Sequence, residues 1–434
     1  MEMRVRKTGR AMLLGIIAVT LLSWLLMSAF RINGIQYLAD PLNVGLLVCV
    51  LLSKEKMRLL QAKYLLLAMG VWLGYMLLNG LCKGAPLPLL LWATRNWGRG
   101  FVLFGGCLVF LEAEDVRRGL RIADGLFIVN FLLAGVELFV FGEKGDFLGG
   151  LFGTQVGCNG NMMIFLVFML LLTLFRTLEE NRITPYRAFV IISSMVLAAC
   201  SEIKLFFYVY PVCVILVTVV YMLKRQTKRG TVAAVLLLGA AALSLGLLIL
   251  RGMFPESFDL LIGRRTWAQY EETSRSVYRI SRTHFIREIN RFFFHDSVPL
   301  NVAGYGFGNC EYSRFGFLTS DFYRQNGEMN YLFFSHQTMF LEGGLVGLGL
   351  YQCIHLALAA EHLRPLIREK GTAMALAYRV VFALFMVACF FYNCSHRADG
   401  SYLIFLGAAV AYFLPLAGRQ PAERGKKVKN CSHL

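Results

Sequence analysis

The chain has 434 residues, of which 57% are hydrophobic and only 16% are charged. A soluble domain usually carries about 25% charged and about 45–50% apolar residues, so the composition excludes an ordinary soluble protein. The formal net charge of +17 would suit a nucleic-acid-binding protein. However, most of the excess lies in short segments between apolar runs, where membrane orientation and anionic lipid headgroups require positive charge. We therefore expect no nucleic-acid partner.

Apolar runs close to the roughly 20 residues needed to span a bilayer recur along the whole chain. There are twelve such runs, at 11–30, 36–53, 64–82, 97–113, 123–141, 157–175, 188–202, 205–223, 231–250, 335–360, 380–394 and 401–417. The first is as short as a signal peptide, but no small-residue cleavage site follows it before Arg31, so we interpret it as a retained helix. Because lipid cannot satisfy backbone polar groups, each run should be an α-helix. The sequence predicts an all-α polytopic membrane protein with about 12 transmembrane helices.

The distribution of lysine and arginine predicts the orientation of these helices. Both termini and the connections on their side hold 27 of the 44 basic residues. The opposite side holds 17, and ten of these lie in the single long segment 251–333. Long translocated segments are exempt from the positive-inside bias, so the comparison for short connections is 27 against 7. We expect both termini in the cytoplasm and the long segment outside it.

The spacing of the runs divides the chain into four parts. These are a bundle of about nine helices (1–250), an extracytoplasmic loop (251–334), about three C-terminal helices (335–418) and a basic cytoplasmic tail (419–434). A loop of that length usually has a function or structure of its own. Within it, Ser281 to Phe294 places apolar residues at helical spacing with arginines on the other faces. This pattern predicts an amphipathic helix at the outer interface.

Arginine is the only basic residue type in the loop, which favours recognition of a phosphate or carboxylate. Guanidinium groups match phosphate oxygens in a bidentate way and neutralise charge on a departing group. Arg279 and Arg282 would lie about one helical turn apart and could face one ligand, with Arg265 as a further contact. The alternative is a solvated helix face whose arginines pair with neighbouring glutamates.

A histidine and a glycine-rich turn mark the end of the loop. Ser335-His336-Gln337 opens the tenth apolar run, and Glu342 follows within it. Histidine is suited to general-base work near neutral pH, although a structural histidine would also fit this position.

Before it, Gly304, Gly306 and Gly308 predict a tight turn whose backbone can approach a ligand. Without a preceding strand, this spacing is not a dinucleotide-binding fingerprint.

Three other polar clusters lie near the predicted outer face. Lys204 interrupts two apolar runs near the outer face, where it could form an internal pair with Glu202 or contribute positive charge to an anionic site. Residues 396–399 are interpreted as a polar turn rather than part of the site. Arg95 and Arg99 border the fourth run and could contact lipid headgroups. The eleven cysteines show no metal-binding spacing, so we predict no metal and no other cofactor.

The order of these features resembles the O-antigen ligase/polymerase superfamily. The residues that carry the resemblance are Pro299-Leu300, Gly304-x-Gly-x-Gly-Asn309 and His336-(x)₅-Glu342-x-Gly-Leu-Val-Gly, after a long basic external loop. The superfamily includes Wzy-type surface-polysaccharide polymerases and WaaL-type ligases. The specific motifs lie within about 200–350, and only the helix count extends over the whole chain.

The resemblance implies a metal-independent, inverting membrane glycosyltransferase with a GT-C-like fold in the bacterial cytoplasmic membrane. The donor would be an undecaprenyl-diphosphate-linked oligosaccharide, and the acceptor a glycan of the O-antigen or capsule type. His336 would activate the acceptor hydroxyl, and either Arg279 or Arg282 would contact the diphosphate. Lys204 stands where the family often has arginine.

Two alternatives to polymerisation remain. One is a ligase that transfers the finished glycan to a lipid, wall or protein acceptor. The other, from a different functional class, is a transporter of lipid-linked sugars. A chain-length regulator is a further candidate partner of a polymerase.

Overall fold

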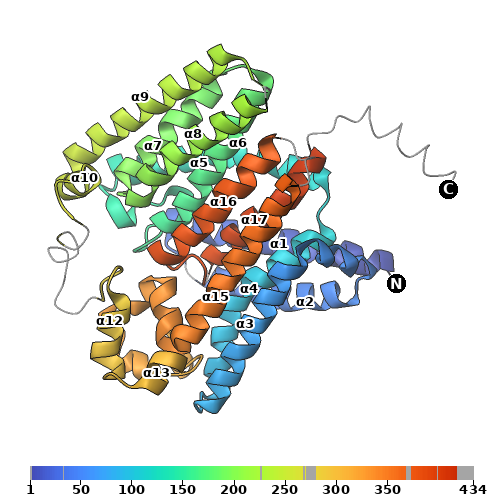
Figure 1. The fold of residues 1–434 in the computed structure, drawn as a ribbon, viewed down its shortest axis with the longest axis vertical. Helices are drawn as coiled ribbons and strands as arrows, with labels where there is room; N and C mark the ends of the chain where they lie inside the picture. The colour runs from blue at the N-terminus through green and yellow to red at the C-terminus, as the bar shows by residue number, and fades with distance from the viewer. Residues whose placement is uncertain are drawn as a thin grey trace.

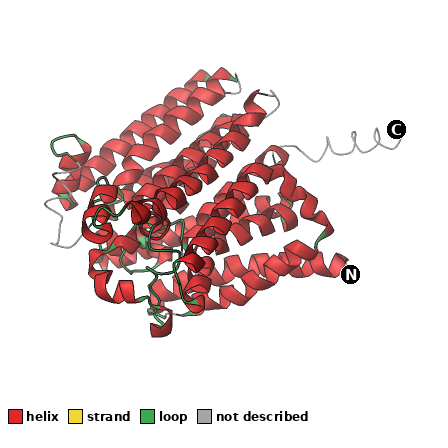
Figure 2. Ribbon diagram, turned by 60° about the horizontal axis from the view of Figure 1, so that its bottom comes forward, coloured by secondary structure: helices red, strands yellow, loops and turns green. Residues whose placement is uncertain are grey.

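The computed structural model describes residues 2–32, 34–224, 227–266, 269, 280–367, 373–397 and 399–417. Within these residues every regular element is a helix, and Figure 2 shows helices joined by loops without a strand. In the described chain, nine helical stretches are long and apolar enough to cross a membrane. The predicted class of all-α polytopic membrane protein is therefore confirmed.

Among the described residues, nine long helices precede the loop and three follow it. The first nine are α1 (Glu2–Phe30), α2 (Ala39–Leu52), α3 (Lys63–Cys82), α4 (Leu87–Phe110), α5 (Ala113–Phe139), α6 (Asn159–Glu180), α7 (Pro185–Cys200), α8 (Lys204–Leu223) and α9 (Arg229–Met253). The last three are α15 (Ser335–Ile367), α16 (Ala373–Tyr392) and α17 (Gly400–Ala417). Each overlaps one predicted run, although α4 begins ten residues before the predicted 97–113. Three of these twelve helices are not among the nine stretches that are long and apolar enough to cross a membrane. They are α4, which carries two arginines, and the shorter apolar helices α7 and α17.

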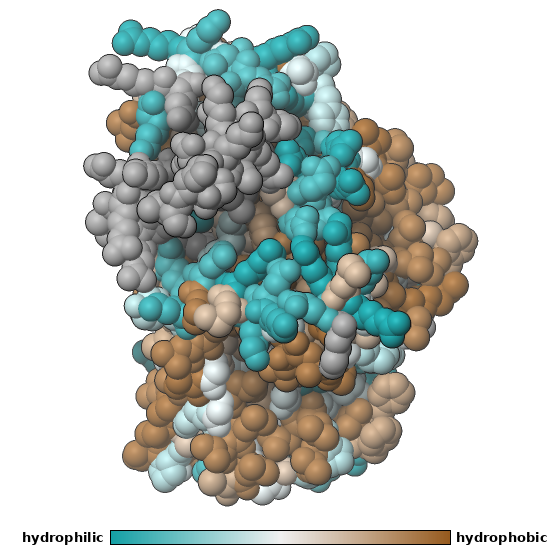
Figure 3. All heavy atoms as spheres, turned by 90° about the vertical axis from the view of Figure 1, so that its right-hand side faces the viewer, coloured by the Kyte–Doolittle hydropathy of each residue, from teal (hydrophilic) through white to brown (hydrophobic). Residues whose placement is uncertain are grey.

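In the described part of the segment between α9 and α15 there are four short α-helices, at one end of the bundle. They are α10 (Pro255–Leu261), α12 (Phe285–Ile289), α13 (Val298–Ala303) and α14 (Asp321–Asn326). In Figure 1, α10, α12 and α13 lie on the side opposite the start of α1 and the end of α17. We call these two sides the loop end and the terminal end. Figure 3 looks onto the side from which α1 starts and shows a band of hydrophilic residues between hydrophobic surfaces.

The helices enclose α6, whose apolar side chains are buried along almost its whole length. α6 packs on α5, α7, α8, α9 and α17. Elsewhere in the bundle α3 packs on α15, α4 on α17, and α7 on α9, while α16 contacts both α15 and α8. Local sequence sets several helix starts. Glu112 and Asp115 form a reciprocal capping box at α5, and Thr184 caps α7 immediately before a proline at its first position. Such caps satisfy backbone N–H groups that have no partner within the helix.

The predicted amphipathic helix is shorter than expected and lies partly inside the protein. Helical structure covers 285–294, and its buried side is formed by Phe285, Ile289 and Phe293, which follow an i, i+4, i+8 spacing. These residues pack with Phe340 and Leu341 of α15 in a second hydrophobic core. Hence the described part of the loop is a folded cap on the bundle.

The long helix α15 is interrupted near the loop end. Gly344 has φ 61° and ψ −159°, so the chain forms a half-helix over 335–343 and resumes at 345. The break frees carbonyls at the end of the half-helix, and the loop occupies two of them. Tyr305 N donates to Leu341 O at 2.9 Å, and Gly306 N donates to Glu342 O at 2.9 Å.

Glycine is required where the two segments meet. A Cβ on Gly344 would lie 2.4 Å from Val302 C and O, and one on Gly304 would lie 2.5 Å from Glu342 C and O. Asn79 of α3 completes the junction by donating to Ala303 O at 2.7 Å and to Glu342 O at 3.1 Å. Irregular backbone at membrane depth is tolerated only where protein groups satisfy it, so this junction holds the loop to the bundle.

We predict that Gly344→Ala destabilises the protein by at least about 2 kcal/mol, because its backbone conformation is strained for alanine and its Cβ would overlap Val302. Gly349→Ala in the same helix is the matched control. A Cβ there meets no atom within 4 Å, and a helical alanine is favoured by up to about 1 kcal/mol. Thermal unfolding in detergent measures both variants. Equal melting temperatures for the two would contradict the described junction.

Candidate functional site

The glycine turn wraps around the carboxylate of Glu342. Gly308 N and Cys310 N both donate to Glu342 Oε1, at 3.0 and 3.1 Å. A Cβ on Gly306 would lie 2.5 Å from Lys83 Cβ, and one on Gly308 would lie 2.9 Å from the backbone of Leu89. The three predicted glycines therefore allow the turn to approach α15 and the connection between α3 and α4. The turn thus fixes the position of the Glu342 carboxylate.

Next to this turn, Arg397 makes a buried ion pair with Glu311. Arg397 Nη2 donates to Glu311 Oε2 at 2.6 Å, and Asn96 Nδ2 donates to the same oxygen at 2.9 Å. Glu311 is 0% exposed and Arg397 is 6% exposed. Burial opposes the charged form of Arg397, but the carboxylates of Glu311 and Glu342 raise its pKa above the usual value. The guanidinium of Arg397 thus hydrogen-bonds to Glu311 and also attracts the nearby buried carboxylate of Glu342 electrostatically.

Further polar groups from α4 and the α16–α17 turn surround this pair. Arg99 donates to Asp399 Oδ1 at 2.6 Å. His396 Nε2 donates to the carbonyl of Met386 at 2.9 Å, which leaves His396 Nδ1 to accept from the hydroxyl of Tyr351 at 3.0 Å. Burial lowers the pKa of His396 to about 4, against the opposing effect of the Met386 carbonyl. This histidine is therefore neutral at physiological pH and acts as a fixed link between α15 and α16.

His336 lies at the start of the half-helix and is fully buried among aromatic rings. Its ring centroid is 4.5 Å from that of Phe285 and 5.3 Å from that of Phe391. His336 Nδ1 lies 3.3 Å from the carbonyl of Phe390. A carbonyl can only accept, so this contact places the proton on Nδ1. Nε2 is then the basic nitrogen. It makes no hydrogen bond of good geometry within the described chain, although the backbone of Arg282 also lies close to the ring.

Arg282 lies beside His336. Its guanidinium is 4.5 Å from the ring centroid of Phe334 and 5.1 Å from that of Tyr392, so it rests over two aromatic faces. Gln337 Nε2 donates to Ser281 O at 3.2 Å and holds the preceding backbone to the half-helix. The structure thus brings together two of the predicted site residues, a histidine with an unpaired ring nitrogen and a stacked arginine.

The other predicted cations have local partners around α10 or lie outside the described residues. Lys204 Nζ is 2.9 Å from Glu202 Oε1, so the internal pair considered from the sequence is present. Arg265 is 3.6 Å from Glu256. Arg279 lies outside the described part of the chain. Of the predicted cations that the structure describes, Arg282 is the one that contacts Phe334, whose ring lies next to His336.

The sequence interpretation missed the buried centre formed by Asn96, Arg99, Glu311 and Arg397. His396, Arg397 and Asp399 do lie between α16 and α17, but the Arg397 side chain is buried, and Arg99 pairs with Asp399 while Arg95 pairs with Asp40. These ion pairs correct the expectation that Arg95 and Arg99 contact lipid headgroups. The sequence did contain one signal for this centre. Asn96 and Arg99 lie inside the apolar helix α4, and polar residues in such a position usually face a cavity or a partner.

We predict that Arg397→Gln destabilises the protein by about 3–5 kcal/mol, because it leaves two buried carboxylates without their guanidinium. The double variant Glu311→Gln/Arg397→Gln should recover part of this loss. Arg324→Gln is the control, since its ion pair with Asp321 is exposed and worth below about 1 kcal/mol. Urea or thermal unfolding measures all three. A Tm of Arg397→Gln equal to that of Arg324→Gln would show that the pair is not structurally important.

Chemically, the described residues offer a base, a stacked cation and a rigid polar support, all at the loop end. Among these residues no group of three or more His, Cys, Asp or Glu side chains is placed to hold a metal ion. Comparison of the chain with models of known protein families and with curated proteins finds no match.

Proposed function

We propose that the protein is a membrane glycosyltransferase that polymerises a surface polysaccharide from undecaprenyl-diphosphate-linked oligosaccharides. The observation that supports it most is that the guanidinium of Arg282 lies over Phe334 and Tyr392, next to His336, whose Nε2 makes no hydrogen bond of good geometry within the described chain. A buried polar atom without a partner is unusual in proteins and often marks a functional site. A GT-C-like arrangement of twelve spans in the bacterial cytoplasmic membrane, with the loop end outside, belongs to the same proposal.

The donor would bind with its diphosphate on Arg282. A guanidinium held over aromatic rings is poorly hydrated, which favours exchange of its contacts for phosphate oxygens. Phe285 and Arg282 both belong to the loop, whereas His336 belongs to the half-helix. Movement of 280–294 away from the half-helix would therefore open His336 Nε2 to an acceptor hydroxyl and prepare Arg282 for the donor.

In the reaction, His336 Nε2 would take the proton of the acceptor hydroxyl as that oxygen attacks the anomeric carbon of the donor. The bond between this carbon and the phosphate oxygen would break, and undecaprenyl diphosphate would leave with its negative charge near Arg282. A single displacement inverts the anomeric configuration. Electrostatic stabilisation of such a leaving group and general-base assistance are both established contributions to enzyme rates.

A transporter of lipid-linked sugars remains the second candidate. It is favoured by the broken helix α15 and the two fully buried carboxylates around Arg397, since discontinuous helices and intramembrane charges are common in transporters. Transfer of the finished glycan by a ligase would use the same chemistry with another acceptor. Product analysis separates the three, because only polymerisation lengthens a lipid-linked glycan.

We predict that purified protein converts a defined undecaprenyl-diphosphate repeat unit into a ladder of longer products, and that His336→Gln lowers the rate by about 10²–10⁴-fold. Glutamine keeps a polar side chain but cannot accept the proton at neutral pH. His284→Gln is the matched control because His284 is an exposed histidine in the neighbouring loop segment, and its rate should equal that of the wild type.

A thermal-shift measurement should accompany the assay, so that loss of activity is separated from loss of fold. A folded His336→Gln variant that makes the full ladder would refute the catalytic role of His336. Transfer to a non-glycan acceptor without a ladder would support the ligase alternative instead.

A further inference from the structure

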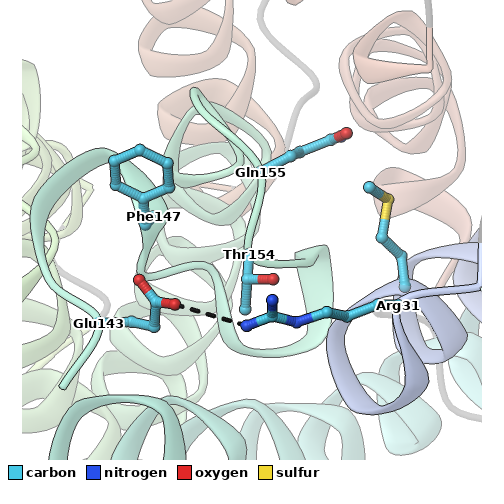
Figure 4. Close-up of a pocket in the computed structure, with 6 residues that line it drawn as sticks. Arg31, Glu143, Phe147, Thr154 and Gln155 are labelled. Atoms are coloured by element: carbon cyan, nitrogen blue, oxygen red, sulfur yellow. Dashed lines mark ion pairs between the residues drawn. The ribbon is translucent and has the colours of Figure 1, made fainter. Parts of the chain in front are cut away.

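A pocket lined by two apolar side chains, Met27 and Phe147, and by four polar ones lies beside the loop-end terminus of α1. Its volume is about 370 Å³, and its lining includes Arg31, Glu143, Thr154 and Gln155. Figure 4 shows the Arg31 side chain extending across the pocket towards Glu143, with Thr154 beside its guanidinium. Arg31 Nη2 and Glu143 Oε1 are 3.8 Å apart, which is an ion pair beyond hydrogen-bond distance. The pocket therefore carries one positive and one negative group side by side.

One wall of this pocket is formed by the loop that follows α5, and hydrogen bonds from α5 hold this loop in a fixed conformation. The buried carboxylate of Glu137 accepts from Gly149 N at 3.2 Å and Gly150 N at 2.7 Å. The same residue accepts from the hydroxyl of Ser28 on α1 at 2.6 Å, and Asn130 Oδ1 accepts from Leu151 N at 2.9 Å. Because the loop is fixed to both helices, residues 143–155 present their side chains in a defined arrangement.

An apolar groove lies along the same helix, towards the terminal end. Its volume is about 550 Å³, and it is lined by side chains of α1, α5, α6 and α17 from Arg10 to Trp24 along α1. At a rise of 1.5 Å per residue this part of α1 measures about 21 Å, which exceeds half of the ~30 Å hydrocarbon thickness. Trp24 and Phe152 meet at its upper end, with ring centroids 5.2 Å apart.

The pocket and the groove are successive layers of one surface. Trp24 of the groove and Met27 of the pocket are three residues apart on α1, and Phe152 and Thr154 are two residues apart on the loop. A pocket that carries two opposite charges, next to an apolar groove along the same helix, matches the shape of an amphiphile. Hydrocarbon binds such a groove through the area that it removes from lipid and water contact.

We propose that this surface binds one zwitterionic phospholipid of the leaflet at the loop end, of the phosphatidylethanolamine class. Its phosphate lies against Arg31 and Thr154, its ammonium lies against Glu143, and one acyl chain occupies the groove between α1 and α5. The charge pattern favours a zwitterion, because an anionic headgroup satisfies Arg31 but meets repulsion from Glu143. The site is independent of the proposed glycosyltransferase activity and uses none of its residues.

Tryptophan quenching tests the proposal directly, because Trp24 lines the groove. The full chain in detergent is titrated with phosphatidylethanolamine or phosphatidylglycerol carrying brominated acyl chains. We expect saturable quenching by the first lipid, its loss in Trp24→Phe, and about fivefold weaker binding of the second. Arg31→Gln should remove the preference between the two lipids, whereas Arg251→Gln, at the loop end of α9 and outside the pocket lining, should keep it.

A second test of the proposal fills the groove with a larger side chain. Ala18 is exposed on α1 and lines the groove, so Ala18→Phe should weaken quenching at least several-fold. Ala11 is an equally exposed alanine of the same helix that is not part of the lining, and Ala11→Phe should behave like the wild type.

Equal, non-saturating quenching by both lipids in every variant would overturn the site. Displacement of the brominated lipid by undecaprenyl phosphate at lower concentration than by unlabelled phosphatidylethanolamine would overturn the assigned occupant.

Discussion

The arrangement of the loop end depends on the break in the backbone of α15 at Gly344. A helix that stops inside a membrane protein leaves carbonyl groups that lipid cannot satisfy. Here the turn at 304–310 and Asn79 satisfy those of Leu341 and Glu342. The loop is therefore joined to the bundle by main-chain hydrogen bonds, and the position of every group on the half-helix depends on that junction.

The half-helix has two working sides. Glu342 faces the glycine turn and the buried pair of Arg397 and Glu311, which ties the loop to α4 and to the α16–α17 turn. His336 and Gln337 face the loop segment that carries Arg282. The proposed opening of the site would move 280–294 away from His336 while the charged centre around Arg397 stays in place.

The helices were predictable from the sequence because their signal is local: long apolar runs separated by basic connections. The position of the amphipathic segment at 285–294 was predictable for the same reason, although its packing on Phe340 was not. The break at Gly344 was missed, since a glycine within an apolar run looks like any small residue of a membrane helix. Arg397 was assigned to a turn because its partner Glu311 is 86 residues away, and only the fold brings the two together. The sequence did not decide between Arg279 and Arg282; in the structure Arg282 contacts Phe334 and Tyr392, and Phe334 lies two residues before His336.

The central claim is that the loop end, with His336 and Arg282, faces away from the cytosol. Labelling of intact cells with a membrane-impermeant maleimide tests it, in a background where the tail residue Cys431 and the cysteines that are exposed in the described chain, Cys82, Cys353 and Cys394, are serine. Phe317, in the loop, is 75% exposed and Lys56, at the terminal end, is exposed, so Phe317→Cys and Lys56→Cys report on the two sides. The account predicts labelling of Phe317→Cys in intact cells and of Lys56→Cys only after permeabilisation. The reverse pattern would contradict it.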